Sequence, residues 1–295
     1  MDSQQHTLNI IIADFSIQLL SDSFIEPEEG YLPFMVDKFE NEPDITIQCF
    51  AGLPKNPFEN DVLVFEAENE VQKFYSIYKI GNELGFIIYN QQTKNNIQQI
   101  ALLDSTFTQW KVYSKLSPDN QISALKYPLG PIVMLYMTLN SDAVLMHASC
   151  AYDGKSARLF SGFSGAGKST ISQLWAASGN SIINDDRIII RKQQNGYFVH
   201  NTPMYYKDMP KKAPLSSIYL ISHFPENKAK RITGALAISK VMAFCIQNNF
   251  DRQFIQSRLN FFSELCLQIP VYELGFVPDE NVVNYVLANE AGRTK

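Results

Sequence analysis

The 295-residue chain is poor in the residues that build several common kinds of site. It has four cysteines, and none stands in a C-x-x-C pair, which argues against a zinc site or a redox dithiol. Acidic residues (30) outnumber basic ones (25), so the chain lacks the basic charge that nucleic-acid binders carry. We therefore expect free thiols in a reducing compartment and no nucleic-acid partner.

Long apolar runs are also missing. The longest, Ile132–Leu139, is far too short to cross a bilayer. The polar start, Met1–His6, lacks the basic and apolar regions of a signal peptide. We expect a cytoplasmic protein that does not contact a membrane.

The composition is otherwise that of a globular protein, with 45% hydrophobic and 19% charged residues. Residues 8–113 hold β-branched and aromatic runs broken by turn signals, which predicts a mostly antiparallel meander. The turn signal Ser117–Asn120 then precedes a helical apolar stripe over residues 128–139. We expect a β-rich accessory or substrate-recognition domain over residues 1–120 and a second domain over residues 121–295.

The most specific motif lies in the second part. Residues 162–170, GFSGAGKST, fit the phosphate-binding pattern G-x-x-x-x-G-K-S/T, in which backbone N–H groups surround phosphates. Lys168 would reach the β- and γ-phosphates, and Ser169 would bind Mg²⁺. The motif predicts bound ATP, or another nucleoside triphosphate, with Mg²⁺. The expected contacts are Gly162, Ser164, Gly165, Ala166, Gly167, Lys168, Ser169 and Thr170.

The flanking residues favour a true phosphate loop. Residues 156–161 are typical of a strand leading in, and residues 168–178 of a helix with one apolar face. Upstream, Asp153-Gly154 separates the strand-like run 143–152 from the loop's strand, which is a strong signal for a two-residue hairpin. We expect the loop's strand to pair antiparallel with its predecessor, unlike the strands of commoner phosphate-loop proteins.

Charged side chains near this motif are candidates for its chemistry. Asp185 and Asp186 end the strand-like run 181–186, and adjacent residues at a strand end point to different sides. If that strand neighbours the loop's strand, both carboxylates lie near the bound phosphates. His147 lies on the strand before the hairpin, where a histidine alone is more often structural. Guanidinium groups that could hold phosphate, or simply lie on the surface, belong to Arg231, Arg252 and Arg258.

The run from Met146-His147-Ala148-Ser149 through the hairpin and loop to Asn184–Arg187 resembles the catalytic domain of HPr kinase/phosphorylase and its relatives, over about residues 127–290. That domain shares its fold with phosphoenolpyruvate carboxykinase, so the resemblance implies an α/β (α+β) protein with a mixed sheet. It implies Asp185 as the base that takes the acceptor's proton and Asp186 as a metal or acceptor contact. It also implies a supporting catalytic role for His147, and it allows a ring-like homo-oligomer.

One segment departs from that family. After its second hairpin, HPr kinase has a glutamate that helps to hold Mg²⁺, whereas Asn201–Tyr206 of this chain contains none. The leading hypothesis is an ATP- and Mg²⁺-dependent kinase acting on a hydroxyl, such as a serine of a protein or peptide. An alternative is a nucleotide-binding regulatory or scaffold protein without turnover. A carboxykinase acting on an oxaloacetate-like substrate is a third hypothesis, although no matching metal-ligand segment is recognised.

Overall fold

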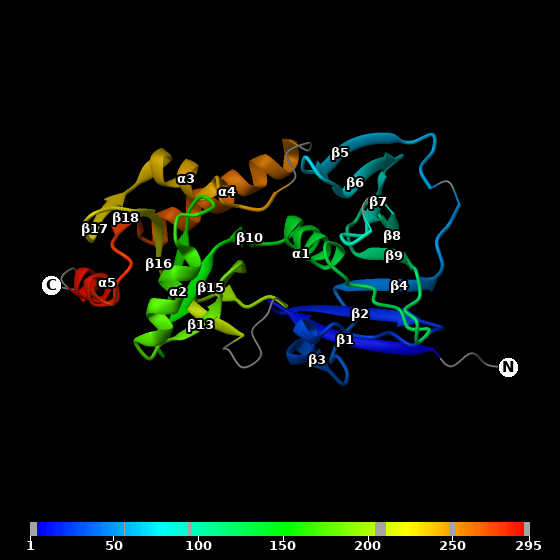
Figure 1. Cartoon of the computed structure of the whole chain (residues 1–295), viewed down its shortest axis with the longest axis horizontal. Coiled ribbons are helices and arrows are strands. Elements are labelled where there is room, and N and C mark those ends of the chain that lie inside the picture. The colour runs from blue at the N-terminus through cyan, green and yellow to red at the C-terminus, as the bar shows by residue number, and fades with distance from the viewer. Residues whose placement is uncertain (1–4, 56, 94–95, 204–210, 248–251, 292–295) are drawn as a thin grey trace. The chain divides into compact units, whose positions relative to one another are not determined.

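The computed structural model describes residues 5–55, 57–93, 96–203, 211–247 and 252–291. The chain forms two compact units, Met1–Asn140 and Ser141–Lys295, each built around a mixed β-sheet (Figure 1). The units divide later than the boundary expected near residue 120. The boundary lies later because helix α1 (Leu129–Leu139) belongs to the first unit, where its Tyr136 ring packs edge-on against Phe86. No helix in the described ranges is long and apolar enough to cross a membrane.

The sheet of the first unit has the strand order β3-β1-β2-β4-β9-β8-β7-β6-β5. Strands β5 to β9 form the expected antiparallel meander, but β4 runs parallel to both β2 and β9. The elements before α1 are β1 (His6–Ile12), β2 (Phe15–Ser21), the 3₁₀ helix η1 (Glu29–Phe34), β3 (Met35–Val36), β4 (Ile45–Ala51), β5 (Val62–Glu68), β6 (Lys73–Ile80), β7 (Glu83–Tyr89), β8 (Ile97–Leu103) and β9 (Gln109–Ser114).

The sheet of the second unit has the order β10-β14-β15-β16-β12-β11-β13, and β18 joins it between β16 and β17. The long strand β16 pairs antiparallel with β15 at its start and parallel with β12 and β18 further on. The strands are β10 (Ala143–His147), β11 (Ser149–Tyr152), β12 (Ala157–Ser161), β13 (Ser181–Asn184), β14 (Arg187–Gln193), β15 (Gly196–His200), β16 (Lys212–His223), β17 (Lys228–Ile232) and β18 (Val271–Phe276).

Helices cover both faces of this sheet. On one face, α2 (Lys168–Ala177) and α5 (Asn281–Ala291) bury residues such as Trp175 against the strands. On the other, α3 (Gly234–Met242) and α4 (Arg252–Gln268) bury residues such as Phe262. Each such large side chain contributes about 2–3 kcal/mol through its burial. The hydrophobic clusters on the two faces of the sheet hold the carboxyl ends of β12, β16 and β18 in one layer.

Two expectations for the second unit need correction. The run 143–152 is two strands: β10 pairs with β14, whereas β11 pairs with β12 and β13. The antiparallel pairing of β11 with β12 is confirmed, but the turn is centred on Gly154-Lys155. The reason is that the Asp153 carboxylate accepts hydrogen bonds from the Lys155 and Ser156 N–H groups, so Asp153 closes the turn instead of forming its centre.

Candidate phosphate-binding site

The glycine-rich loop connects β12 to α2, in the strand–loop–helix order that the motif requires. Gly165 and Gly167 have φ values of 79° and 98°, in the left-handed region that glycine enters without strain. Gly167 is the N-cap of α2, so the loop ends at a helix N-terminus. The positive end of the helix dipole and its free N–H groups favour a bound anion there.

Lys168 already points into the loop. Its Nζ donates hydrogen bonds to the Gly162 carbonyl (2.9 Å) and the Phe163 carbonyl (3.3 Å), at the loop's first residues. Burial lowers the pKa of this ammonium group, and the negative charge of Asp186 partly offsets the shift. The cation is therefore held, largely out of water, beside the start of the loop.

The loop rests on the ends of β16 and β18 so closely that side chains are excluded. A Cβ at Gly162 would lie 2.8 Å from the Ile221 carbonyl oxygen, and one at Gly167 would lie 2.8 Å from the Phe276 ring. His223, at the end of β16, has Nε2 3.0 Å from the Gly165 carbonyl oxygen. Its contact with the loop could not be predicted, because sequence patterns do not specify which strand end meets the loop.

Asn184 organises the turn that carries the two aspartates. Its Oδ1 accepts hydrogen bonds from the backbone N–H groups of Asp186 (2.9 Å) and Arg187 (3.2 Å). Its Nδ2 donates to the Asn201 side chain (2.9 Å). Asn184 and Asn201 are buried, so this polar network is protected from water and rigid. Neither asparagine was predicted as a site residue, although Asn184 directly precedes the pair.

Asp186 and Asp185 have different surroundings. Asp186 Oδ1 lies 3.4 Å from His147 Nδ1, and its Oδ2 lies 2.6 Å from Arg187 Nη1. These contacts, the hydrogen bond with His147 first among them, lower the pKa of Asp186 against the effect of burial, and Lys168 adds to the shift. Asp185 is half-buried and has no hydrogen-bond or ion-pair partner within the described ranges. Asp186 is thus held ionised, and Asp185 keeps its oxygens available.

Strand pairing brings these groups together from distant parts of the sequence. The aspartates' strand, β13, is not adjacent to the loop's strand, β12, contrary to the arrangement considered from the sequence. Instead β11 lies between them and pairs antiparallel with both, so the loop and the aspartate turn begin at the ends of the two strands that flank β11. Ser161 Oγ donates to the His147 carbonyl (2.8 Å), and the Ala148 N–H donates to the Asp186 carbonyl (3.1 Å). His147, Lys168 and Asp186 therefore surround one end of the loop. Ser169 and Thr170 lie on the first turn of α2, and Ser164 is exposed in the loop.

Other predicted groups lie elsewhere. Arg258 is 1% exposed and donates to the Ala143 carbonyl in the core, so it cannot hold a phosphate at the surface. Arg231 is exposed on β17, and Arg252 begins α4. The segment Asn201–Tyr206 stands where HPr kinase has a glutamate that helps to hold Mg²⁺. Here Asn201 and Thr202 hydrogen-bond to the aspartate turn, and residues 204–206 lie outside the described ranges.

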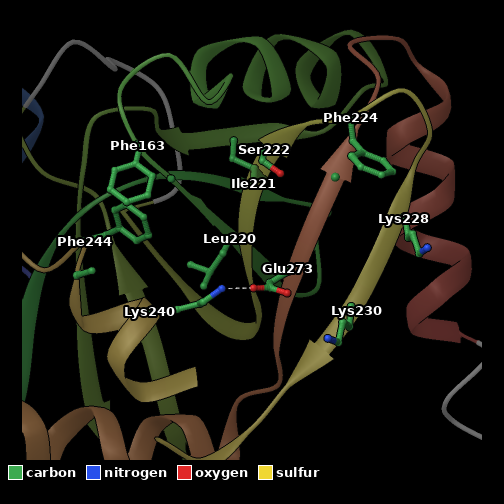
Figure 2. A pocket seen from close by; sticks show the side chains of 13 residues that line it. Phe163, Leu220, Ile221, Ser222, Phe224, Lys228, Lys230, Lys240, Phe244 and Glu273 are labelled. Carbon is green, nitrogen blue, oxygen red and sulfur yellow. Dashed lines mark hydrogen bonds and ion pairs between the residues drawn. The ribbon is translucent and has the colours of Figure 1, made fainter. Parts of the chain in front are cut away.

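A cavity of about 550 Å³ lies beside the start of the loop (Figure 2). Gly162 and Phe163 line it, together with residues from the carboxyl ends of β16 and β18, from β17 and from α3. Its wall combines aromatic rings with charged side chains. The described residues contain no group of three or more His, Cys, Asp or Glu side chains that could by itself hold a metal ion.

Comparison with known proteins supports the chemistry of the loop. The model of the phosphoenolpyruvate carboxykinase family matches residues 131–213, a segment that includes the loop, His147 and both aspartates. No curated protein matches the chain. The family uses ATP, and its members carry out phosphoryl transfer coupled to carboxykinase chemistry. Residues 131–213 are therefore similar to the ATP-utilising domain of phosphoenolpyruvate carboxykinase.

Proposed function

We propose that this protein is an ATP-dependent phosphotransferase that moves the γ-phosphate to a hydroxyl acceptor, in the manner of HPr-kinase-related enzymes. The observation that carries the proposal is the Asp185 carboxylate, which has no partner among the described residues, at the strand end across β11 from a phosphate loop whose lysine is already in position. Phosphoryl transfer needs charge neutralisation, positioning and a group that takes the acceptor's proton. The loop, His147 and the aspartate pair supply these three.

Each residue has a defined part. Lys168 and the amides of the loop hold the phosphates, and their positive charge offsets the negative charge that develops during transfer. Asp185 accepts the proton of the acceptor hydroxyl while that oxygen bonds to the γ-phosphorus. The bond between the γ-phosphorus and the bridging oxygen breaks, and ADP leaves with that oxygen. His147 and Arg187 orient Asp186 and keep it ionised.

The residues fit a magnesium ion bound together with the nucleotide. Mg²⁺ is usually held by one or two carboxylates and by substrate phosphates, not by a complete protein cage. Ser169 and Asp186 would be its protein ligands, which agrees with the lack of a three-residue metal cluster among the described residues. When bound, the ion neutralises phosphate charge. The family's extra glutamate is not required for such a site.

The test compares wild type with Asp185→Asn, using γ-labelled ATP. Removing a general base lowers transfer by about 10²–10⁴-fold, while binding of a fluorescent ADP analogue persists. Asp119→Asn, an exposed change in the first unit, is the matched control and keeps full activity. Wild-type transfer by Asp185→Asn would exclude Asp185 as the base. Tight ADP binding by a wild type that neither transfers phosphate nor hydrolyses ATP would instead support a regulatory or scaffold role.

A second candidate is a carboxykinase, favoured by the family whose model matches residues 131–213. Such an enzyme phosphorylates the enol oxygen of an oxaloacetate-like acid as CO₂ leaves. Incubation with ATP and oxaloacetate distinguishes the two: a carboxykinase releases CO₂ in step with ADP. A hydroxyl kinase forms ADP without any CO₂ beyond spontaneous decarboxylation.

A further inference from the structure

The cavity beside the loop lies at the end of the nucleotide where transfer takes place. In a phosphate loop the lysine reaches the β- and γ-phosphates. Lys168 Nζ contacts the carbonyls of Gly162 and Phe163, and both of these residues line the cavity. Thr170, the last residue of the motif, lies on α2 and does not line it. The γ-phosphate is therefore closer to the cavity than the nucleoside is.

The cavity also adjoins the proposed catalytic groups. Phe244 lines it, and the Phe244 carbonyl accepts a hydrogen bond from the His147 N–H (3.0 Å). His147 in turn contacts Asp186. An acceptor seated in the cavity thus needs to extend only past Phe244 to bring a hydroxyl to the aspartate pair.

The walls favour a particular kind of occupant. Phe163, Phe224 and Phe244 provide aromatic surface, and the Phe163 and Phe244 rings meet edge-on at 5.2 Å (Figure 2). Phe163 is 78% exposed and Phe224 46%, so the cavity opens to solvent at its aromatic rim. Such a site suits one apolar side chain on a longer segment that continues outside, more than a small enclosed molecule.

The charges on the walls are unbalanced. Three lysines, Lys228, Lys230 and Lys240, line the cavity together with one carboxylate, Glu273, which is paired with Lys240. Among the described residues, the side-chain ammonium groups of Lys228 and Lys230 on β17 have no hydrogen-bond or ion-pair partner. A neutral nucleobase would leave these two ammonium groups uncompensated, whereas a carboxylate on the occupant would pair with them.

We propose that this cavity binds the acceptor, and that the acceptor is an acidic peptide segment with an apolar residue near the serine or threonine that is phosphorylated. The assignment of the acceptor rests on the proposed phosphotransferase function. The chemistry of the occupant rests on the cavity itself. Phosphorylation proceeds as described above, with the peptide hydroxyl as the attacking group.

The test uses two pools of octapeptides, each with a serine near its middle. Peptide binding is measured in the presence of ADP and Mg²⁺, and phosphorylation is measured with labelled ATP and Mg²⁺. One pool has Asp, Glu, Leu and Phe at the other positions, and the second has Lys and Arg in place of the acids. We expect wild type to bind and label the acidic pool about tenfold better. Lys230→Glu abolishes this preference, whereas Lys155→Glu, in the turn between β11 and β12, preserves it.

Each alternative outcome has its own signature. Equal use of both pools by wild type, or an unchanged preference in Lys230→Glu, would overturn the proposal. A loss of ADP-analogue affinity in Lys230→Glu but not in Lys155→Glu would place the nucleoside in the cavity and also overturn it. Binding of the acidic pool that depends on Lys230, without any labelling, would support the peptide site and reject the phosphotransferase function.

Discussion

His147 Nδ1 and Asp186 Oδ1 lie 3.4 Å apart, although 38 residues of sequence separate the two side chains on the strand ends that flank the phosphate loop. Their contact is the largest cause of the lowered pKa of Asp186. A carboxylate with a lowered pKa is a weak base but a good partner for cations. This pairing therefore distinguishes Asp186, the oriented anion, from Asp185, the proposed base.

Replacing His147 with alanine should raise the pKa of Asp186, because burial then acts without its main opposing contact. The pKa of Asp186 in the folded protein is lower than its ordinary value of 3.8. Ionised Asp186 therefore contributes its full stabilisation of the fold at pH values above 3.8. The contribution disappears as the pH falls through the lowered pKa. Urea unfolding should therefore find His147→Ala less stable than wild type at neutral pH, with the difference disappearing as the pH falls through the lowered pKa of Asp186. A difference that stays constant over the acidic range would contradict the linkage.

Replacing Lys168 with methionine should abolish nucleotide binding without unfolding the protein. Nucleotide at about 100 times its dissociation constant stabilises wild type by about 2.7 kcal/mol, a rise of several degrees in Tm. Lys168→Met should show no such rise in Tm, and Lys155→Met should show all of it.

The stability of wild type without nucleotide should depend on pH through Lys168. Burial lowers the pKa of Lys168, so folding disfavours its charged form. The free energy of unfolding should therefore increase as the pH rises through that lowered pKa towards 10.5.

Alanine at Gly167 should cost more than alanine at Gly179, although both positions have positive φ. Open space surrounds Gly179, so its variant bears only the conformational penalty of about 1–2 kcal/mol. At Gly167 the new methyl group also meets the Phe276 ring, which should add about 1–3 kcal/mol. Thermal unfolding of the two variants measures the difference. Equal costs would mean that Phe276 moves freely away from the loop.

Glu290 should be needed to attach α5 to the sheet. Its Oε2 accepts hydrogen bonds from buried Arg158 (2.9 and 2.8 Å), and its Oε1 accepts from Ser217 and Tyr219 (both 2.8 Å). Glu290→Ala leaves Arg158 with Asp153 as its remaining acidic partner and should cost about 3 kcal/mol in urea unfolding. The exposed control, Glu280→Ala, should cost far less. Similar losses in both variants would show that the network adds little.

The phosphate loop was predictable because its chemistry is local. Successive glycines, a lysine and a hydroxyl residue must be adjacent for backbone amides to surround a phosphate, so residues 162–170 carry the motif as a continuous run. The hairpin before the loop and helix α2 after it were also predicted, from turn residues and an apolar stripe. Even there, the centre of the turn lies one residue later than predicted, because the side chain of Asp153 accepts backbone hydrogen bonds.

Contacts between distant segments were decided by the tertiary structure. Nothing in the run Lys228–Arg231 indicated an edge strand, because its pairing with β18 supplies the hydrogen bonds that define it. Likewise, Asn184 and Asn201 become partners only when β13 and the end of β15 meet. The amino-acid sequence therefore specifies a phosphate-binding loop and, further along the chain, two adjacent carboxylates. The fold decided which carboxylate is paired, what the loop rests on and which cavity adjoins it, since strand pairing sets these distances.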